Sequence, residues 1–178
     1  MKIYTKTGDS GKTSLFDNTR VWKSNERIMS YGAVDELNSA IGIAISLDLE
    51  PKVKEVLIKI QNDLFVVGSD LANPDMADTK IRTTEKMIKF LEESIDTFES
   101  ELAELTSFIL PGGTLLASIL HLSRTIARRA ETHVVGLSQN EEISTFPTVY
   151  LNRLSDLLFV LARVSNKRSS VSDIIWSP

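Results

Sequence analysis

Residues 51–74 read PKVKEVLIKIQNDLFVVGSDLANP, and this stretch decides the fold class. Six apolar residues recur in it at alternating steps of four and three: Val53, Leu57, Ile60, Leu64, Val67 and Leu71. This spacing places all six on one face of an α-helix. Pro51 suits the first helical position because its fixed φ matches that of a helix, and Asn73-Pro74 stops the pattern. The stretch therefore predicts an amphipathic helix that begins at Pro51.

Four further segments show the same helical period. One runs from Asn25 to Leu47, and one starts at Thr83 or Thr84 with a stripe that continues through Leu102 to Leu105. A third follows the Pro-Gly-Gly break at 111–113 and should end near Gly136, and a fourth follows Pro147. No alternating strand pattern, repeat or linker composition separates them. We therefore expect an all-α fold, a five-helix antiparallel bundle over residues 25–167.

Composition limits the classes of protein and of partner. With 42% hydrophobic and 25% charged residues, the 178-residue chain should fold as one domain, 1–178, with a polar and mobile tail at 168–178. A net charge of −4 gives no overall basic field for nucleic acid or an anionic membrane. The chain has no cysteine and only two histidines, so no metal site is expected. No run of about 20 apolar residues and no signal-like segment is present, which predicts a cytoplasmic protein without a membrane span.

The N-terminal segment 1–24 differs from the rest. Residues 5–14 read TKTGDSGKTS, in which glycines, hydroxyls and lysines suit a polyphosphate. A Walker A loop would need glycine where Lys6 stands and a buried strand before it, so the P-loop fold is excluded. An ordinary turn without a ligand remains the alternative.

Polar residues also gather on two of the predicted helices. His121, Arg124, Arg128 and Glu131 share one face, away from the leucine stripe, with Arg129 beside them. Guanidinium groups bind phosphates through two parallel hydrogen bonds, although a solvated charged face is the alternative. Asn152, Asp156 and Arg163 line up opposite the leucines of the last helix, where a solvated face is again the alternative.

Two isolated residues invite an explanation. Asp35 lies in a largely apolar helix beside Asn38 and Ser39, so we expect an arginine from another element to pair with it. Phe108 precedes the Pro-Gly-Gly turn, where an aromatic residue usually anchors a loop to the core. His121 and His133 are too far apart along a helix to form a metal pair.

Taken together, six ordered motifs resemble the PduO-type ATP:cob(I)alamin adenosyltransferases. They are Tyr4-Thr5-Lys6-Thr7-Gly8-Asp9 with Gly11, Val34-Asp35-Glu36-Leu37-Asn38, Ile60-Gln61-Asn62-Asp63-Leu64-Phe65, Leu110-Pro111-Gly112-Gly113, Arg128-Arg129-Ala130-Glu131 and Tyr150-Leu151-Asn152-Arg153-Leu154-Ser155-Asp156. The resemblance covers the chain from Lys2 to about Asn166.

The resemblance implies a homotrimer of five-helix bundles with ATP bound at each subunit interface. The N-terminal loop of one subunit, 1–24, would bind the nucleotide together with the helices of its neighbour. The implied ATP-binding residues are Thr5, Lys6, Thr7, Gly8, Thr13, Ser14, Lys23, Arg128, Arg129, Glu131 and Asn152, with Mg²⁺ accompanying the triphosphate. Lys12 matches no fixed position of the family.

The implied reaction is attack by the cobalt of cob(I)alamin on C5′ of ATP, which forms adenosylcobalamin and releases inorganic triphosphate. Arg128 and Lys6 would act on the phosphates. Phe108 would fill the lower face of the corrinoid, and Asp35 and Arg124 would pair between subunits beside it. Implied partners are cob(I)alamin, a reductase, for which a flavin type is one candidate, and an adenosylcobalamin-dependent enzyme. A module that binds ATP or delivers adenosylcobalamin without catalysis is the alternative, and a bundle used only for assembly is a third.

Overall fold

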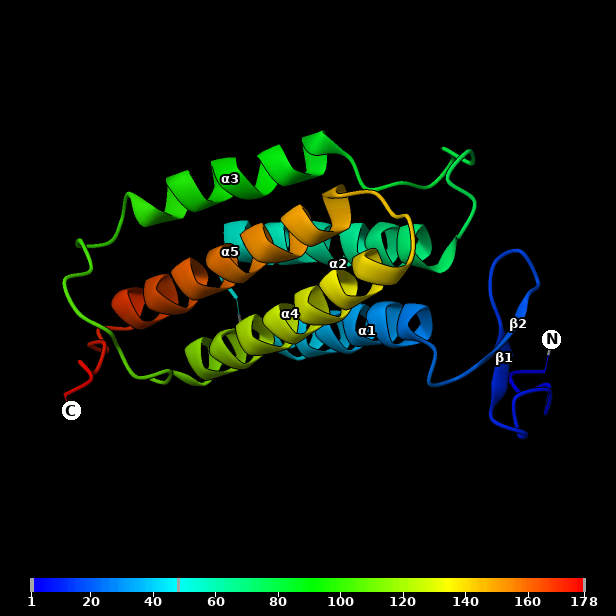
Figure 1. Cartoon of the computed structure of the whole chain (residues 1–178). Coiled ribbons are helices and arrows are strands. Elements are labelled where there is room, and N and C mark those ends of the chain that lie inside the picture. Colours follow the sequence, from blue (N-terminus) through cyan, green and yellow to red (C-terminus); the bar gives the residue numbers. More distant parts are fainter. Residues whose placement is uncertain (1, 48, 178) are drawn as a thin grey trace.

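The structure is a computed structural model that describes residues 2–47 and 49–177. Its helices are α1 (Glu26–Ile45), α2 (Pro51–Ala72), α3 (Glu85–Glu99), α4 (Leu115–Asn140) and α5 (Phe146–Arg168). Two short strands, β1 (Lys12–Ser14) and β2 (Arg20–Trp22), form an antiparallel hairpin before α1. The expected helical bundle is confirmed, and Figure 1 shows its long helices lying side by side.

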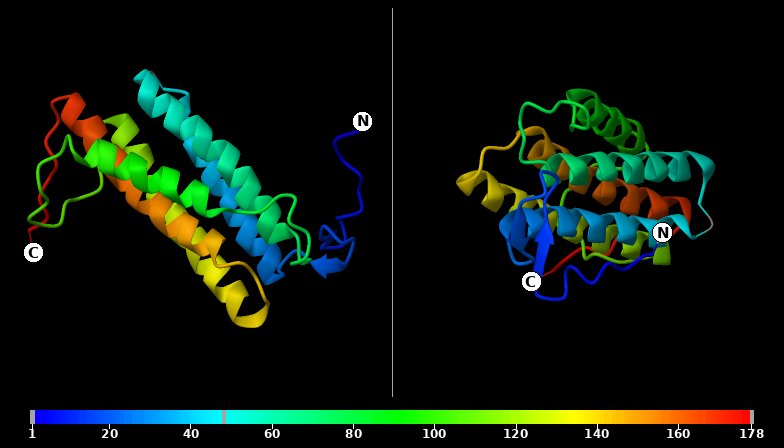
Figure 2. Two further views of the ribbon diagram at one scale, coloured as in Figure 1. Left: turned by 90° about the horizontal axis from the view of Figure 1, so that it is seen from above. Right: turned by 90° about the vertical axis from the view of Figure 1, so that its right-hand side faces the viewer.

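The packing of the helices is centred on α4. α4 packs against both α1 and α5, α2 packs against α1, and α3 covers α5. Figure 2 shows the same order from two other directions. None of the described helices combines the length and the continuous apolar character needed to cross a bilayer.

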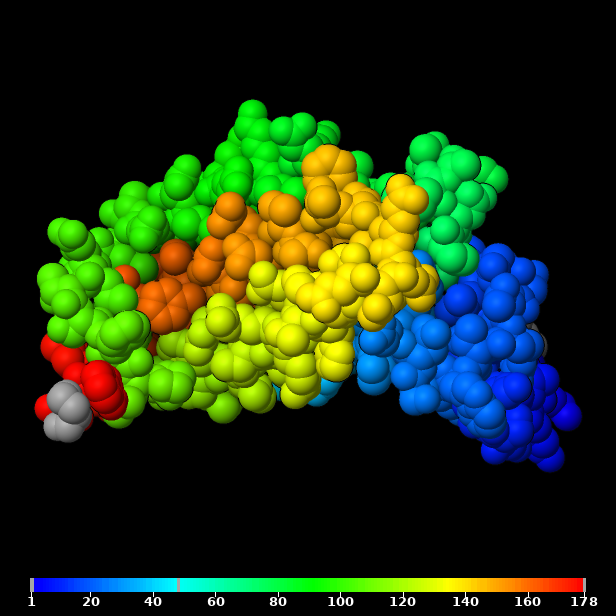
Figure 3. Space-filling view, in the orientation of Figure 1, coloured from blue at the N-terminus to red at the C-terminus, as the bar shows by residue number. Residues whose placement is uncertain are grey.

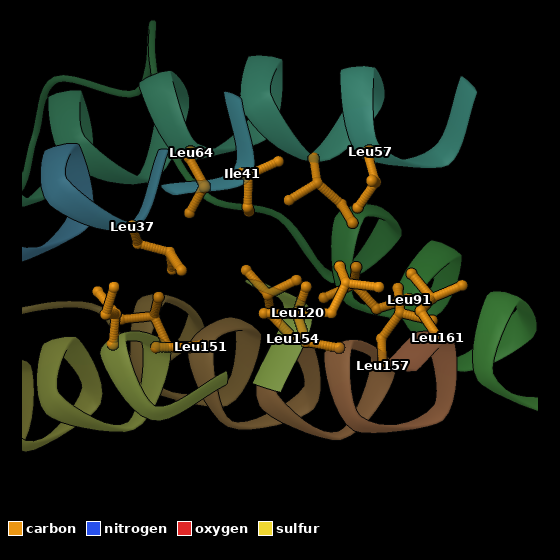
Figure 4. Packing of buried hydrophobic residues seen from close by; sticks show 14 of the residues in the cluster. Leu37, Ile41, Leu57, Leu64, Leu91, Leu120, Leu151, Leu154, Leu157 and Leu161 are labelled. Atoms are coloured by element: carbon orange, nitrogen blue, oxygen red, sulfur yellow. The ribbon is translucent and has the colours of Figure 1, made fainter. Parts of the chain in front are cut away.

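The predicted apolar stripes form the core. All six stripe residues of α2 are buried, and Leu37, Ile41, Leu120, Leu154 and Leu161 from three other helices meet them. Figure 4 shows labelled members of this set, among them Leu57, Leu64 and Leu120, pointing toward one another between the helices. Because burial of a leucine or isoleucine side chain contributes roughly 1.5–3 kcal/mol, this contact surface holds the bundle together.

Two predicted helix ends were wrong. α3 ends at Glu99, where Ser100 N donates back to Asp96 O, so Leu102 and Leu105 lie outside the helix. Leu102 still packs against the core from the following turn, which explains why the apolar spacing continued past the helix. α4 runs to Asn140, beyond Gly136, because Leu137 continues its buried stripe. A glycine within a helix costs only about 1 kcal/mol relative to alanine, which such burial offsets.

The two ends of the bundle carry different segments. The β1–β2 hairpin stands beyond the start of α1 at one end, and the C-terminal segment lies with the loop between α3 and α4 at the other (Figures 1 and 2). At the hairpin end, the buried Arg27 donates to Glu141 Oε2 at 2.5 Å and to Leu71 O at 2.6 Å. This one side chain therefore ties together α1, α2 and the end of α4.

Candidate functional site

The N-terminal loop is shaped by its hairpin. Gly11 has a φ of +80°, which favours glycine, and the Trp22 ring lies against the position where a Cβ would stand. Lys23 N donates to Gly11 O at 2.9 Å, which closes the loop onto the residue after β2. The loop therefore folds back on itself and brings Lys23 close to residues 5–11.

Several residues expected to bind ATP meet in this loop. A Cβ on Gly8 would lie 3.2 Å from Lys23 Nζ, so the ammonium group rests against the Gly8 backbone. Thr5 Oγ1 and Thr7 Oγ1 are 2.9 Å apart, and both threonines are exposed. Lys6 adopts a positive φ of 62°, a conformation that is uncommon outside glycine and concentrates at functional sites. Hydroxyl and ammonium donors thus share one exposed surface.

Arg20 organises this loop, and the sequence motifs do not reveal it. Its Nη2 donates to Thr7 O at 2.7 Å and to Lys12 O at 3.3 Å, and its Nη1 lies 3.5 Å from Ser14 Oγ. The signal that could have found it is the pairing of Ser14 with Arg20 across the hairpin, which requires the hairpin to be predicted first. Lys12 Nζ lies 4.8 Å from the centre of the Trp22 ring, a cation–π contact that gives this lysine a role inside the loop.

A second group of expected residues lies along α4 and α5. Asn152 Nδ2 donates to Glu131 Oε1 at 3.1 Å, so these two predicted residues are in contact. Arg128 and Arg129, by contrast, point to different sides of α4. Arg129 Nη2 lies 2.5 Å from Glu36 Oε2 of α1, whereas Arg128 borders a hollow on the side of α3 and α5.

That hollow is about 310 Å³ and carries two guanidinium groups. Its lining residues come from three helices: Ile95, Glu99, Arg124, Arg128, Ser155, Asp156, Phe159 and Val160. Figure 3 shows this side of the molecule, with α5 between α3 and α4. Arg124 Nε is buried without a hydrogen-bond partner among residues 2–47 and 49–177. Burial and the neighbouring charge of Arg128 lower the pKa of Arg124, so an anion placed here would relieve both effects.

His121 does not share the exposed face predicted for it. It is buried, and its ring stands edge-on to Phe159 with ring centres 5.8 Å apart. Burial, followed by the charge of Arg124, lowers the pKa of His121, while Asp173 acts in the opposite direction. Its neutral form is therefore favoured, as for a core histidine.

Asp35 faces a different hollow, between α1 and α2. This depression of about 250 Å³ is also lined by Tyr31, Leu64 and Phe65, and the Phe65 side chain is exposed. The expectation of a buried Asp35 paired with an arginine is not met within the described part of one chain, since Asp35 is exposed and forms no salt bridge there. Arg124 lines the hollow of α3, α4 and α5 instead.

Phe108 is exposed, so the prediction that it anchors the loop to the core was wrong. Its side chain is 78% exposed and meets Trp176 edge-on, with ring centres 6.4 Å apart. The solvated face considered as an alternative for the polar residues of α5 does not hold for Arg163, which is buried and whose Nε donates to Asp173 Oδ2 at 2.9 Å. The tail thus lies against the bundle in this structure, and its mobility stays a prediction.

The expected site residues form separate groups in one chain. The loop of residues 5–23 stands at one end of the bundle, and Phe108 belongs to the loop at the opposite end (Figure 1). Arg128, Glu131 and Asn152 occupy α4 and α5 between those ends. Among the described residues, no three His, Asp or Glu side chains converge so as to hold a metal ion.

Comparisons with known proteins identify the family of this chain. The family described as cobalamin adenosyltransferase matches residues 3–165. A corrinoid adenosyltransferase of Mycobacterium leprae is 45% identical, over 99% of this chain and 96% of its own length. A corrinoid adenosyltransferase of Bacillus subtilis is 48% identical, over 98% of this chain and 91% of its own length.

A solved structure extends the similarity to three dimensions. A variant of a PduO-type ATP:corrinoid adenosyltransferase from Lactobacillus reuteri, complexed with cobalamin and ATP, superposes with a TM-score of 0.93 at 38% identity. The match covers 99% of this chain and 100% of that one. The chain belongs to the cobalamin adenosyltransferase family.

Proposed function

We propose that this protein transfers the 5′-deoxyadenosyl group of ATP to the cobalt of cob(I)alamin and releases inorganic triphosphate. The observation that carries this proposal is the full-length match to a structure solved with cobalamin and ATP bound. The exposed hydroxyl and ammonium donors of the N-terminal loop and the paired guanidinium groups of α4 supply the chemistry such substrates need.

The active protein is a homotrimer in this proposal, with each site built from two subunits. The β1–β2 hairpin stands at one end of the bundle (Figure 1), whereas Arg128 and Glu131 belong to α4 and Asn152 to α5, and in this proposal a second copy brings its loop to them. Asp35 is exposed beside Phe65, and Arg124 has a buried Nε without a partner in the described chain. A salt bridge between Asp35 of one subunit and Arg124 of the next would satisfy both groups.

ATP would lie between the loop and the neighbouring helices. The loop supplies Thr5, Lys6, Thr7, Gly8, Thr13, Ser14 and Lys23, and the neighbour supplies Arg128, Arg129, Glu131 and Asn152. The exposed hydroxyls of the loop fit the part of a protein ligand to Mg²⁺, which takes most of its other ligands from phosphates and water. The ion would neutralise phosphate charge.

The residues need only align the reactants and stabilise charge, because cob(I)alamin itself is the nucleophile. As cobalt bonds to C5′, the C5′–O bond breaks and its electron pair leaves with the triphosphate. Arg128 and Lys6 would stabilise that charge with fixed donors. Phe108 would occupy the lower face of the corrinoid and favour four-coordinate cobalt(II), which is more easily reduced.

The decisive experiment mixes the protein with ATP and chemically reduced cobalamin. Formation of the Co–C bond is followed in the visible spectrum, and triphosphate release is measured in the same reaction. We expect both products in equal amounts. The alternative, a module that binds ATP or delivers adenosylcobalamin, predicts saturable binding with no triphosphate.

The cellular setting is part of the same proposal. The protein would work in the cytoplasm, receive reduced corrinoid with the help of a reductase, for which a flavin type is one candidate, and pass adenosylcobalamin to a dependent enzyme. A reconstituted pair of reductase and transferase that converts cobalt(II) substrate at neutral pH would support this placement.

A further inference from the structure

Phe108 is held in place by its backbone. With 78% of its surface exposed, it gains little from packing against the core. Phe108 O accepts a hydrogen bond from Trp176 N at 2.8 Å, and Leu110 N donates to Ile174 O at 2.8 Å. These bonds form a short antiparallel bridge between the loop and the C-terminal segment. Whatever fixes the C-terminal segment therefore also fixes Phe108.

Asn166, near the end of α5, is bonded to both of these segments. Its side chain is buried, and its Nδ2 donates to Gly112 O at 3.0 Å and to Asp173 Oδ1 at 3.2 Å. Its Oδ1 accepts from Thr114 N at 2.9 Å. One amide group thus joins the helix to the Pro-Gly-Gly turn and to the C-terminal segment.

The residues around Asn166 leave space for its amide group and hold its partner Asp173 in place. Gly113 has a φ of +111°, and a Cβ there would stand 2.1 Å from Asn166 Oδ1. Only glycine leaves room for the amide at this distance. Asp173, the second partner of Asn166, is also bonded to the buried Arg163, with Nε and Oδ2 2.9 Å apart.

We propose that Asn166 is a positioning residue of the adenosyl transfer, one that sets the place of Phe108 through the turn and the C-terminal segment. This inference rests on the proposed function. An asparagine is suited to the task because its partners include two acceptors, Gly112 O and Asp173, and one donor, Thr114 N. Aspartate can serve only the donor, and it would face the Asp173 carboxylate.

The test uses variants of the full chain in which the hydrogen-bond donors and acceptors of residues 166 and 173 are changed. Asn166→Asp should repel Asp173 and detach the C-terminal segment. Adding Asp173→Asn gives a side chain that donates to residue 166 and accepts from Arg163, which should restore that contact in part. Asp173→Ala removes the contact from the C-terminal segment without changing the sequence of α5. Ser172→Ala, a neighbouring exposed change, is the matched control.

Hydrogen–deuterium exchange measures directly how well the loop that carries Phe108 is held against the C-terminal segment. We expect the amides of Leu110 and Trp176 to exchange about five- to thirtyfold faster in Asn166→Asp and Asp173→Ala, as for the loss of one or two hydrogen bonds. The double variant should recover part of this protection, and Ser172→Ala should match the wild type. Unchanged exchange in Asp173→Ala, whether or not Asn166→Asp folds, overturns the inference.

The visible spectrum shows whether displacement of Phe108 changes the coordination of cobalt(II) in the bound corrinoid. With cobalt(II) substrate and ATP, the four-coordinate signal should fall in Asn166→Asp and Asp173→Ala, as in Phe108→Ala, and turnover should fall about tenfold with the KM for ATP little changed. Faster exchange with an undiminished four-coordinate signal would refute a positioning role. The exchange measurement needs no cobalamin, so it decides the placement of Phe108 even if the wild type releases no triphosphate, which would overturn the proposed function instead.

Discussion

Arg20 Nη2 donates to the carbonyl oxygen of Thr7 at 2.7 Å, which links the hairpin to the middle of the N-terminal loop. The same guanidinium also reaches Lys12 O. Because these bonds go to backbone atoms of the loop, Arg20 stabilises the loop conformation whichever side chains surround it.

Loss of this guanidinium should weaken ATP binding. In Arg20→Ala the loop loses two backbone hydrogen bonds, each of which contributes roughly 1 kcal/mol, so we expect the KM for ATP to rise about 30-fold. Arg20→Lys should recover little, since one ammonium group does not reproduce the fork of a guanidinium. Lys54→Ala, a charge-matched change on α2, should behave like the wild type. An unaltered KM for ATP in Arg20→Ala would show that Arg20 does not contribute to nucleotide binding.

Arg128 and Arg129 should differ in their effect on turnover. Arg128→Ala removes a guanidinium from the hollow beside Ser155, and we expect kcat to fall about 10²–10³-fold, as for the loss of a donor to a developing anion. Arg129→Ala should cost less, because that side chain is paired with Glu36. Steady-state kinetics with cob(I)alamin measures both, and Lys89→Ala on α3 is the exposed control. Equal losses in the two arginine variants would contradict the geometry.

The ion pair of Arg27 and Glu141 predicts an asymmetry in stability. Glu141→Ala leaves a buried cation with only Leu71 O as its partner, so the free energy of unfolding should fall by about 3 kcal/mol. Arg27→Met removes the cation, and the partly exposed Glu141 can be hydrated, so the loss should be about 1–2 kcal/mol. Urea unfolding at matched protein concentration compares them. A larger loss in Arg27→Met would show that the pair contributes mainly through packing.

His121 predicts a loss of stability in mild acid. Burial lowers its pKa in the folded state below the ordinary value of 6.5, so the unfolded chain binds a proton more readily. Stability from this group is present above about pH 6.5 and is lost as the pH falls toward the lowered value. In His121→Phe, the unfolding free energy should depend less on pH below about pH 6.5. An identical pH profile in the variant would mean that His121 makes no such contribution.

The sequence predicted the helices well and their boundaries less well. The stripe of α2, from Val53 to Leu71, follows from period alone, because a buried face must recur every three to four residues. The ends of α3 and α4 depend on where the chain turns, and apolar spacing continued past one end in Leu102 and Leu105. The three-residue strands were too short to show an alternation.

In the candidate site, too, some features were predictable from the sequence and others were not. Glycines, hydroxyls and lysines near the start predict a phosphate-binding loop, and the structure brings Gly8 and Lys23 together. The role of Arg20 depends on strand pairing, and the burial of His121 and Arg163 depends on Phe159 and on Asp173 of the tail. Such contacts between distant segments leave no periodic signal in the sequence.

The separation of the loop from the helix α4 arginines has a genetic consequence. Two inactive variants, one altered at Lys6 and the other at Arg128, should complement each other when their subunits are mixed. In the trimer proposed above, a mixed assembly would bring the intact loop of one subunit against the intact arginine of another, and one working site would be rebuilt. Co-expression of two defective alleles would therefore restore adenosyl transfer that neither allele provides alone.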